Sequence, residues 1–271
     1  MGHELRGLAI RAGPNAIKPP QRYYTYIMPK KSNEIKKIEK HKRINDILLG
    51  PLERPAIAWL VKHLPYWVTP DHLTFFGFAS ALMIGVSYYL TSFDKNFLWL
   101  ANLGFIFNWF GDSLDGNLAR HRKIERPAYG FFIDHSIDTV SEVSIFIGLG
   151  LSPYVDLNLA FLALVGYLCM ANLVYITTSV KGVFKISYGT LGPTEVRVIA
   201  ILSNIAVYIL GNPQIKLPGF SFSLYNLILI CIIVLLFFFF FYTVIVEGVQ
   251  LERQDREKWL KKLEGNDSDD K

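Results

Sequence analysis

Long hydrophobic runs separated by short polar stretches dominate the chain from residue 73 to residue 247. Each run is close to the roughly 20 residues that a helix needs to cross the hydrocarbon core of a bilayer. The pattern predicts membrane-spanning helices at residues 73–91, 97–120, 128–151, 158–179, 194–211 and 222–247. We therefore expect an all-α integral membrane protein, a bundle of six transmembrane helices, because helices satisfy their own backbone hydrogen bonds in lipid.

The segment at residues 44–68 has a different pattern, in which apolar and charged residues alternate. It is too polar to span a bilayer, and Pro51, Pro55 and Pro65 predict interruptions in any continuous helix. An N-terminal interfacial amphipathic segment lying in the headgroup region is the expected structure. The alternative is a buried connector packed against the bundle.

Composition supports the membrane class, since 51% of the residues are hydrophobic and the net charge is +5. The charge is not a nucleic-acid signal, because most basic residues gather in segments on one side of the predicted bundle. These segments are residues 30–43, 121–126, 181–185 and 253–262. By the positive-inside rule, both chain termini and the loops on this side face the cytoplasm. We expect membrane lipids as partners and no nucleic acid.

The same patterns divide the chain into four regions. They are a basic cytoplasmic tail at residues 1–43, the interfacial segment at 44–68, a six-helix domain at 69–250, and a charged cytoplasmic C-terminal tail at 251–271. The first tail is expected to be solvated, as charged runs usually are. Its alternative role is contact with anionic lipid headgroups.

Four carboxylates interrupt the predicted second and third spans. The polar stripe residues are Asp112, Asp115 and Gly116, followed by Gly130, Asp134 and Asp138. Residues three and four apart share one helix face, so each span has one polar stripe. A short basic link and then Pro127, a favoured first helical residue, join the two spans into a hairpin. The hairpin brings both stripes to similar depth, where they can face each other.

Such a cluster is costly in a membrane unless cations offset its charge. Oxygen ligands without Cys or His suit magnesium, manganese or calcium. Gly116 and Gly130 allow a ligand to approach the backbone closely, and Arg120 offers a fork of donors suited to a phosphate. The residues therefore predict a metal-dependent site for a phosphate ester or pyrophosphate.

The full pattern is Asp112-x-x-Asp115-Gly116-x-x-Ala119-Arg120, nine residues, and then Gly130-x-x-x-Asp134-x-x-x-Asp138. It resembles the signature of the CDP-alcohol phosphotransferases. The resemblance implies a site for two magnesium or manganese ions, bound by Asp112, Asp115, Asp134 and Asp138. It implies that Asp138 is also the catalytic base. It implies that Gly116, Ala119, Arg120 and Gly130 line the CDP site. It also implies a homodimer.

A second polar stretch lies where the fourth predicted span leads to the fifth. Lys181, Lys185 and Arg197 are the residues that we expect to bind a phosphate on a phosphorylated acceptor. If the acceptor is a neutral or amino alcohol, these basic residues serve only to set the orientation of the chain in the membrane. Arg197 cannot easily face lipid, so it is expected to point into the bundle, toward an aspartate or toward a substrate phosphate.

The resemblance implies transfer of a substituted phosphate from a CDP-alcohol to a second alcohol, with release of CMP. It implies CDP-diacylglycerol as the donor and a role in phospholipid biosynthesis. The charges of the loops predict that the site faces the cytoplasm. One alternative is a membrane prenyltransferase, which also holds a pyrophosphate through magnesium and aspartates. The other is a cation or proton transporter, since intramembrane aspartates also mark such pathways.

Overall fold

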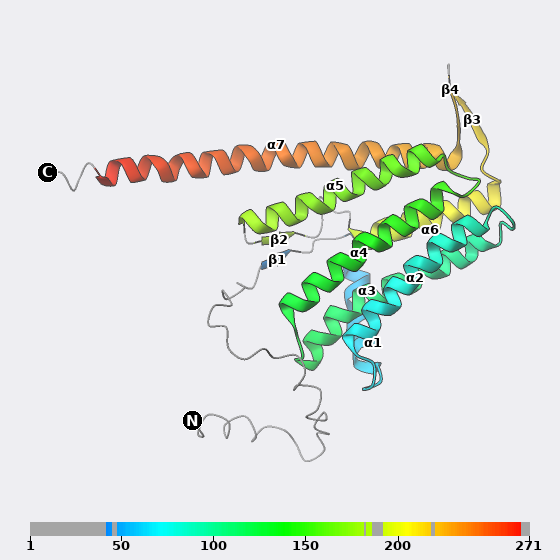
Figure 1. Cartoon of the computed structure of the whole chain (residues 1–271), viewed down its shortest axis with the longest axis horizontal. Helices are drawn as coiled ribbons and strands as arrows, with labels where there is room; N and C mark the ends of the chain where they lie inside the picture. Colours follow the sequence, from blue (N-terminus) through cyan, green and yellow to red (C-terminus); the bar gives the residue numbers. More distant parts are fainter. Residues whose placement is uncertain (1–41, 45–47, 182, 186–191, 218–219, 267–271) are drawn as a thin grey trace, which may run out of the picture. The chain divides into compact units, whose positions relative to one another are not determined.

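The computed structural model describes residues 42–44, 48–181, 183–185, 192–217 and 220–266. Its helices in chain order are α1 (Gly50–His63), α2 (Pro70–Leu90), α3 (Phe97–Arg122), α4 (Pro127–Gly150), α5 (Leu157–Lys181), α6 (Pro193–Leu210) and α7 (Leu224–Asn266) (Figure 1). The prediction of a mainly helical chain is confirmed. Nearly all of the basic N-terminal tail, residues 1–41, lies outside the described residues.

Four of the described helices are long and apolar enough to cross a membrane, namely α2, α5, α6 and α7. Helices α3 and α4 have 26 and 24 residues, which is also a spanning length. They carry the polar stripes, so length and composition alone do not assign them to the bilayer. The structure thus supports a membrane protein and leaves the six-span count as a prediction.

Helix starts follow the local sequence signals. Thr69 caps α2, because its hydroxyl accepts a hydrogen bond from the His72 backbone N–H at 3.2 Å. The His72 ring accepts one in return from the Thr69 backbone N–H. Proline occupies the first turn of α2, α4 and α6, where a backbone N–H has no helical partner to lose.

The predicted interruptions of the interfacial segment at Pro51 and Pro55 were wrong. Helix α1 runs continuously through both prolines. Pro51 is in the first turn, where it removes no hydrogen bond, and Pro55 removes only one. Docking of α1 on α3 offsets that loss, because α1 contributes Val61 to a small buried apolar cluster with residues of α3. The helix does end where Pro65 predicts, since Leu64 before it is extended.

Helix α7 also differs from the prediction of a span followed by a separate charged tail. It is one continuous helix of 43 residues (Figure 1). The sequence after residue 247 is rich in Glu, Lys, Arg, Gln and Leu and contains no proline. These residues favour helix, so nothing ends α7 where the predicted span ends.

Short strands, which the sequence did not predict, occur at two places. Strands β1 (Lys42–Ile44) and β2 (Val183–Lys185) pair in parallel, and β3 (Gln214–Leu217) pairs antiparallel with β4 (Phe220–Ser223). The first pair joins the segment before α1 to the segment after α5. The second is a hairpin that connects α6 to α7.

Glycines allow α2 to lie directly against the α3–α4 hairpin. A Cβ atom added at Gly111 of α3 would lie 2.6 Å from the Gly77 backbone of α2. One added at Gly148 of α4 would lie 2.5 Å from the Gly85 Cα atom, again on α2. Both distances are too short for a real side chain. Helix α2 is therefore the fixed support that sets the positions of α3 and α4, which carry the polar stripes.

Candidate active site

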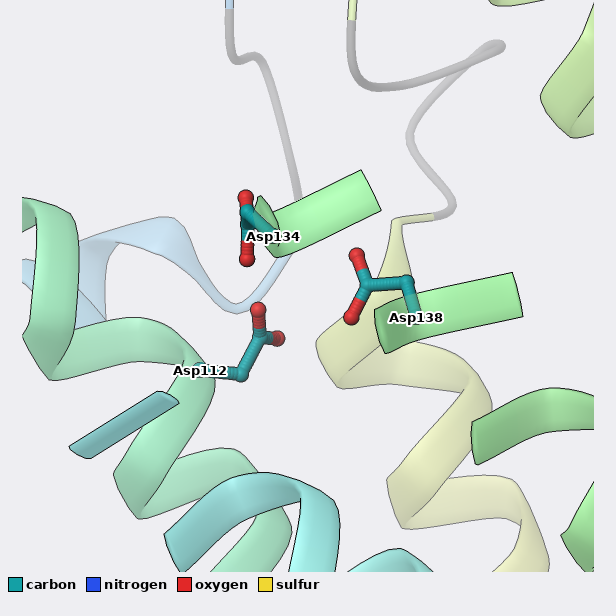
Figure 2. Close-up of side chains that lie close together, drawn as sticks. All are labelled: Asp112, Asp134 and Asp138. Carbon is teal, nitrogen blue, oxygen red and sulfur yellow. The ribbon is translucent and has the colours of Figure 1, made fainter. Parts of the chain in front are cut away.

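Three of the predicted site aspartates converge in the structure. Asp112 of α3 and Asp134 and Asp138 of α4 each place a carboxylate oxygen within 4.8 Å of the others. Figure 2 shows the three carboxylates pointing into a shared space between the two helices. The group offers only oxygen ligands, which suit hard divalent cations such as magnesium or manganese. The residues present therefore fit the metal that the sequence predicts.

Asp115 does not belong to this group of three aspartates. Its side chain is buried and accepts a hydrogen bond of 2.6 Å from the Thr74 hydroxyl of α2. Its other oxygen accepts a hydrogen bond from the Gly116 backbone N–H. The structure thus brings together three of the four predicted ligands. No local sequence pattern indicated the Thr74 contact, because Thr74 comes from another helix.

Arg197 of α6 enters the site and pairs with an aspartate. Its guanidinium donates to Asp112 at 2.6 Å and to the Asn108 side-chain oxygen at 2.8 Å. Asn108 in turn donates to the Gly77 carbonyl of α2 at 3.0 Å. Of the two roles that the sequence left open for Arg197, the structure contains the ion pair. This chain of contacts joins α6, α3 and α2 beside the aspartates.

The two lysines predicted to act with Arg197 are placed differently. Lys181 forms an ion pair with Glu247 of α7 and donates to Gln250 at 3.1 Å. It does not line the cavity that holds the aspartates. Lys185 lies in β2, whose side chains are outside the described part of the chain. Contact of either lysine with an acceptor phosphate remains a prediction.

The aspartates line a cavity of about 1330 Å³. The residues predicted to bind CDP, Gly116, Ala119, Arg120 and Gly130, line it as well. A Cβ atom added at Gly130 would meet no atom within 4 Å, so the missing side chain leaves open space. A Cβ atom at Gly116 would lie 3.4 Å from the Arg120 guanidinium. Gly130 thus leaves open space in the cavity, and Gly116 leaves room beside the Arg120 guanidinium, a group that suits a phosphate.

The basic link between α3 and α4 has a structural role that the sequence did not reveal. Arg122 donates to backbone carbonyls of the α1–α2 connection, at Leu64, Pro65, Tyr66 and Val68. Arg126 pairs with Asp71 in the first turn of α2. These contacts fix the start of α2 next to the end of the hairpin. His135, interpreted from the sequence as a packing residue, packs against Phe131 with ring centroids 4.0 Å apart and ring planes tilted by 31°.

Glu142 is a cavity residue that the sequence reasoning missed. It lies four residues after Asp138 and continues the spacing of Asp134 and Asp138 along α4. The signal was therefore present in the sequence, as one further step of the same stripe. Tyr167 of α5 lines the same cavity, which no local pattern could have indicated.

Glu53 of α1 is a second missed residue, and it joins α1 to the walls of the site. One of its carboxylate oxygens accepts hydrogen bonds from Trp109 at 3.0 Å, Ser113 at 3.1 Å and Thr194 at 3.1 Å. The other oxygen is buried and has no hydrogen-bond partner within the described residues. Ser113 is adjacent to Asp112, and Thr194 opens the helix that carries Arg197. Helix α1 is thereby attached to two elements of the site.

We expect Glu53→Ala to destabilise the protein, because three donors on α3 and α6 would lose a shared charged acceptor. Buried groups left without a partner cost about 1–3 kcal/mol each, less where water can enter. Thermal unfolding of the purified protein in detergent measures the effect. The matched control is Glu252→Ala, which removes an exposed glutamate of α7 and is expected to leave the melting temperature unchanged. Equal melting temperatures for both variants would contradict the proposed anchoring of α1.

Comparison with known proteins agrees with this geometry. The family model for CDP-alcohol phosphatidyltransferase matches residues 67–251. The chain belongs to this family. The matched region contains all of the signature aspartates and the α3–α4 hairpin that holds them. Glu53 and all of α1 lie before it.

Two similar curated proteins come from different branches of life. Cholinephosphotransferase 1 of Rattus norvegicus is 26% identical over 204 residues, which cover 71% of this chain and 50% of that protein. Archaetidylinositol phosphate synthase of Pyrococcus horikoshii is 36% identical over 100 residues, or 36% of this chain and 50% of that protein. The chain thus matches about half the length of these curated relatives.

Proposed function

We propose that this protein is a membrane-embedded transferase that moves a substituted phosphate from a CDP-alcohol to a second alcohol and releases CMP. The convergence of Asp112, Asp134 and Asp138 in one cavity carries the proposal. Membership of the family supports the same reaction. CDP-diacylglycerol is the expected donor, which makes the product a phospholipid. The apolar helices around the site suit a lipid-linked substrate.

The metal ions would be held by Asp112, Asp134 and Asp138. The signature implies Asp115 as a fourth ligand, and its carboxylate would then release the Thr74 hydroxyl. Two magnesium or manganese ions are the expected set. When bound, such ions neutralise charge on the pyrophosphate and on the departing phosphate oxygen. Arg197 keeps the Asp112 carboxylate oriented through its ion pair. Arg120, beside the space left by Gly116, would contact the phosphates of CDP.

Asp138 would accept the proton of the acceptor hydroxyl. The alcohol oxygen then forms a bond to the β-phosphorus, and the bond from that phosphorus to the CMP oxygen breaks. CMP leaves with the bonding electrons. A carboxylate near a metal is a weak base, so positioning and electrostatic stabilisation must supply most of the acceleration.

We place α3 and α4 in the membrane as two further spans, which completes the six-helix bundle. Their polar stripes face the shared cavity rather than lipid, as charged residues in membranes do. The positive-inside rule puts the α3–α4 link, both termini and the site on the cytoplasmic side. A homodimer is part of the same proposal through the family resemblance.

The test is CMP release by the purified full chain with CDP-diacylglycerol, magnesium and a panel of alcohols. We expect release to depend on one class of acceptor, to stop when EDTA removes the metal, and to return with added magnesium or manganese. Release that survives complete chelation would contradict the metal role of the aspartates. Absence of CDP binding, together with cation flux in proteoliposomes, would replace the proposal with the transporter alternative.

A further inference from the structure

The cavity that holds the aspartates continues past them into the interior of the helix bundle. Asp138 and Glu142 are the last acidic residues of α4 that line it, and Ile145 and Leu149 line it further along the helix. From Asp138 to Leu149 the helix advances by about 16 Å. The cavity thus extends away from the α3–α4 link over a distance of roughly half the hydrocarbon core of a bilayer.

The far end of the cavity, here called the apolar chamber, has walls from four helices. It is defined by Phe105 of α3, Ile145 and Leu149 of α4, Ala200 of α6, and Leu229 and Ile232 of α7. Three of these side chains, Phe105, Leu149 and Leu229, belong to the hydrophobic core and are only 3–6% exposed. Beyond Glu142 and Arg197, none of the described residues that line the cavity is charged.

Two tyrosines form the floor of the apolar chamber. Tyr88 lies in the last turn of α2 and Tyr225 in the first turn of α7, and both line the cavity. Their hydroxyls hydrogen-bond to the side-chain oxygen of Asn204 of α6, at 3.0 and 2.7 Å. Asn204 is fully buried and donates in turn to Asn102 of α3 at 2.8 Å. This network joins four helices and holds both rings in place.

A hydrocarbon chain is the occupant that suits these walls. The whole cavity measures about 1330 Å³, whereas pockets for small ligands measure roughly 300–1,000 Å³. The polar part around the aspartates would hold CDP and the reacting groups, which leaves the apolar part for another group. Apolar cavities stay dry and bind apolar molecules. The proposed reaction supplies such a group, because its lipid substrate carries hydrocarbon chains.

We propose that the apolar chamber receives one hydrocarbon chain of the lipid substrate, and that Tyr88 and Tyr225 limit the length of this chain. The inference rests on the proposed function and adds selectivity for chain length to it. A chain that moves from the bilayer into the chamber exchanges one apolar environment for another, so shorter chains are accepted with little preference. A chain that is too long meets rings held by hydrogen bonds, and overpacking of this kind is costly.

The experiment measures CMP release by the full chain with lipids that differ only in chain length, from octanoyl to eicosanoyl. One series is CDP-diacylglycerol given with soluble alcohols, and the other is diacylglycerol given with CDP-choline. Tyr225→Leu lowers the floor and leaves Tyr88 bonded to Asn204, while Ala200→Leu fills the wall. Tyr242→Leu and Ala79→Leu are the matched controls, because they make the same changes at exposed positions of α7 and α2.

We expect kcat/KM to be nearly constant up to a limiting chain length and to fall at least about tenfold beyond it. Tyr225→Leu should move the limit to longer chains and Ala200→Leu to shorter ones, whereas both controls should keep it. The series in which the limit moves identifies the substrate, donor or acceptor, that carries the chain.

A second measurement does not depend on turnover. Lipids of both series with a photoreactive diazirine at the end of one chain are irradiated with the unchanged protein, and labelled residues are identified by mass spectrometry. We expect label on residues of the apolar chamber or on Tyr225. Label confined to exposed residues of α7 such as Val234 and Phe238, or a limit that neither variant moves, overturns the inference and leaves the function standing. Label in the chamber without CMP release from either series contradicts the proposed function and still supports chain binding.

Discussion

Replacing Asp138 by asparagine is expected to reduce CMP release by at least about 10³-fold while the helices remain folded. Asparagine has nearly the same shape but cannot accept the proton of the acceptor, and loss of a general base alone costs about 10²–10⁴-fold. It also removes a charged oxygen from the aspartate group, so weaker metal binding adds to the effect. The measurements are CMP release across a magnesium titration and thermal unfolding in the same detergent.

The matched control is Asp255→Asn, which makes the same chemical change at an exposed position of α7. It is expected to retain full activity. If Asp138→Asn keeps more than about a tenth of the activity, then Asp138 is not the base, because such a loss is below the range for general-base removal. A large loss with a collapsed melting temperature would instead indicate a structural role.

Substituting alanine for Gly148 is expected to have the largest effect on stability. The added methyl group would press directly on the Gly85 backbone of α2, which cannot rotate away as a side chain can. Overpacking of this kind costs about 1–3 kcal/mol or more, which corresponds to a melting temperature lower by about 2–10 °C. Because α4 carries Asp134 and Asp138, its displacement from α2 should also lower CMP release.

Gly248→Ala is the control, since a Cβ atom there meets nothing within 4 Å. Alanine favours helix over glycine by about 0.5–1 kcal/mol, so this variant should melt at the same or a slightly higher temperature. Equal stability of the two variants would show that the close approach of α2 and α4 is not required.

The sequence by itself predicted most of the helices and the placement of the polar stripes on α3 and α4. Thr69 and the prolines at the first turns mark helix starts through local backbone effects, and these act within a few residues of the chain. The four-residue spacing of Gly130, Asp134 and Asp138 sets them on one face of α4 in any fold. Glu142 could have been found by extending the same spacing one step.

Where the sequence prediction was wrong, longer-range packing outweighed a local signal. Pro51 and Pro55 predicted breaks in α1, yet contacts between α1 and α3 stabilise a continuous helix. The charged residues after position 247 predicted a new segment, but α7 continues because nothing in its sequence ends a helix.

Only the tertiary structure decided which polar groups meet. Asp115 accepts from Thr74, Arg197 pairs with Asp112, Lys181 pairs with Glu247, and Glu53 joins α1 to α3 and α6. Each contact joins residues that are far apart in sequence, so it depends on how whole helices pack. Sequence periodicity determines the face of a helix on which a residue lies. The partner across that face is set by the distance between helices, which Gly77, Gly85, Gly111 and Gly148 make short between α2 and the α3–α4 hairpin.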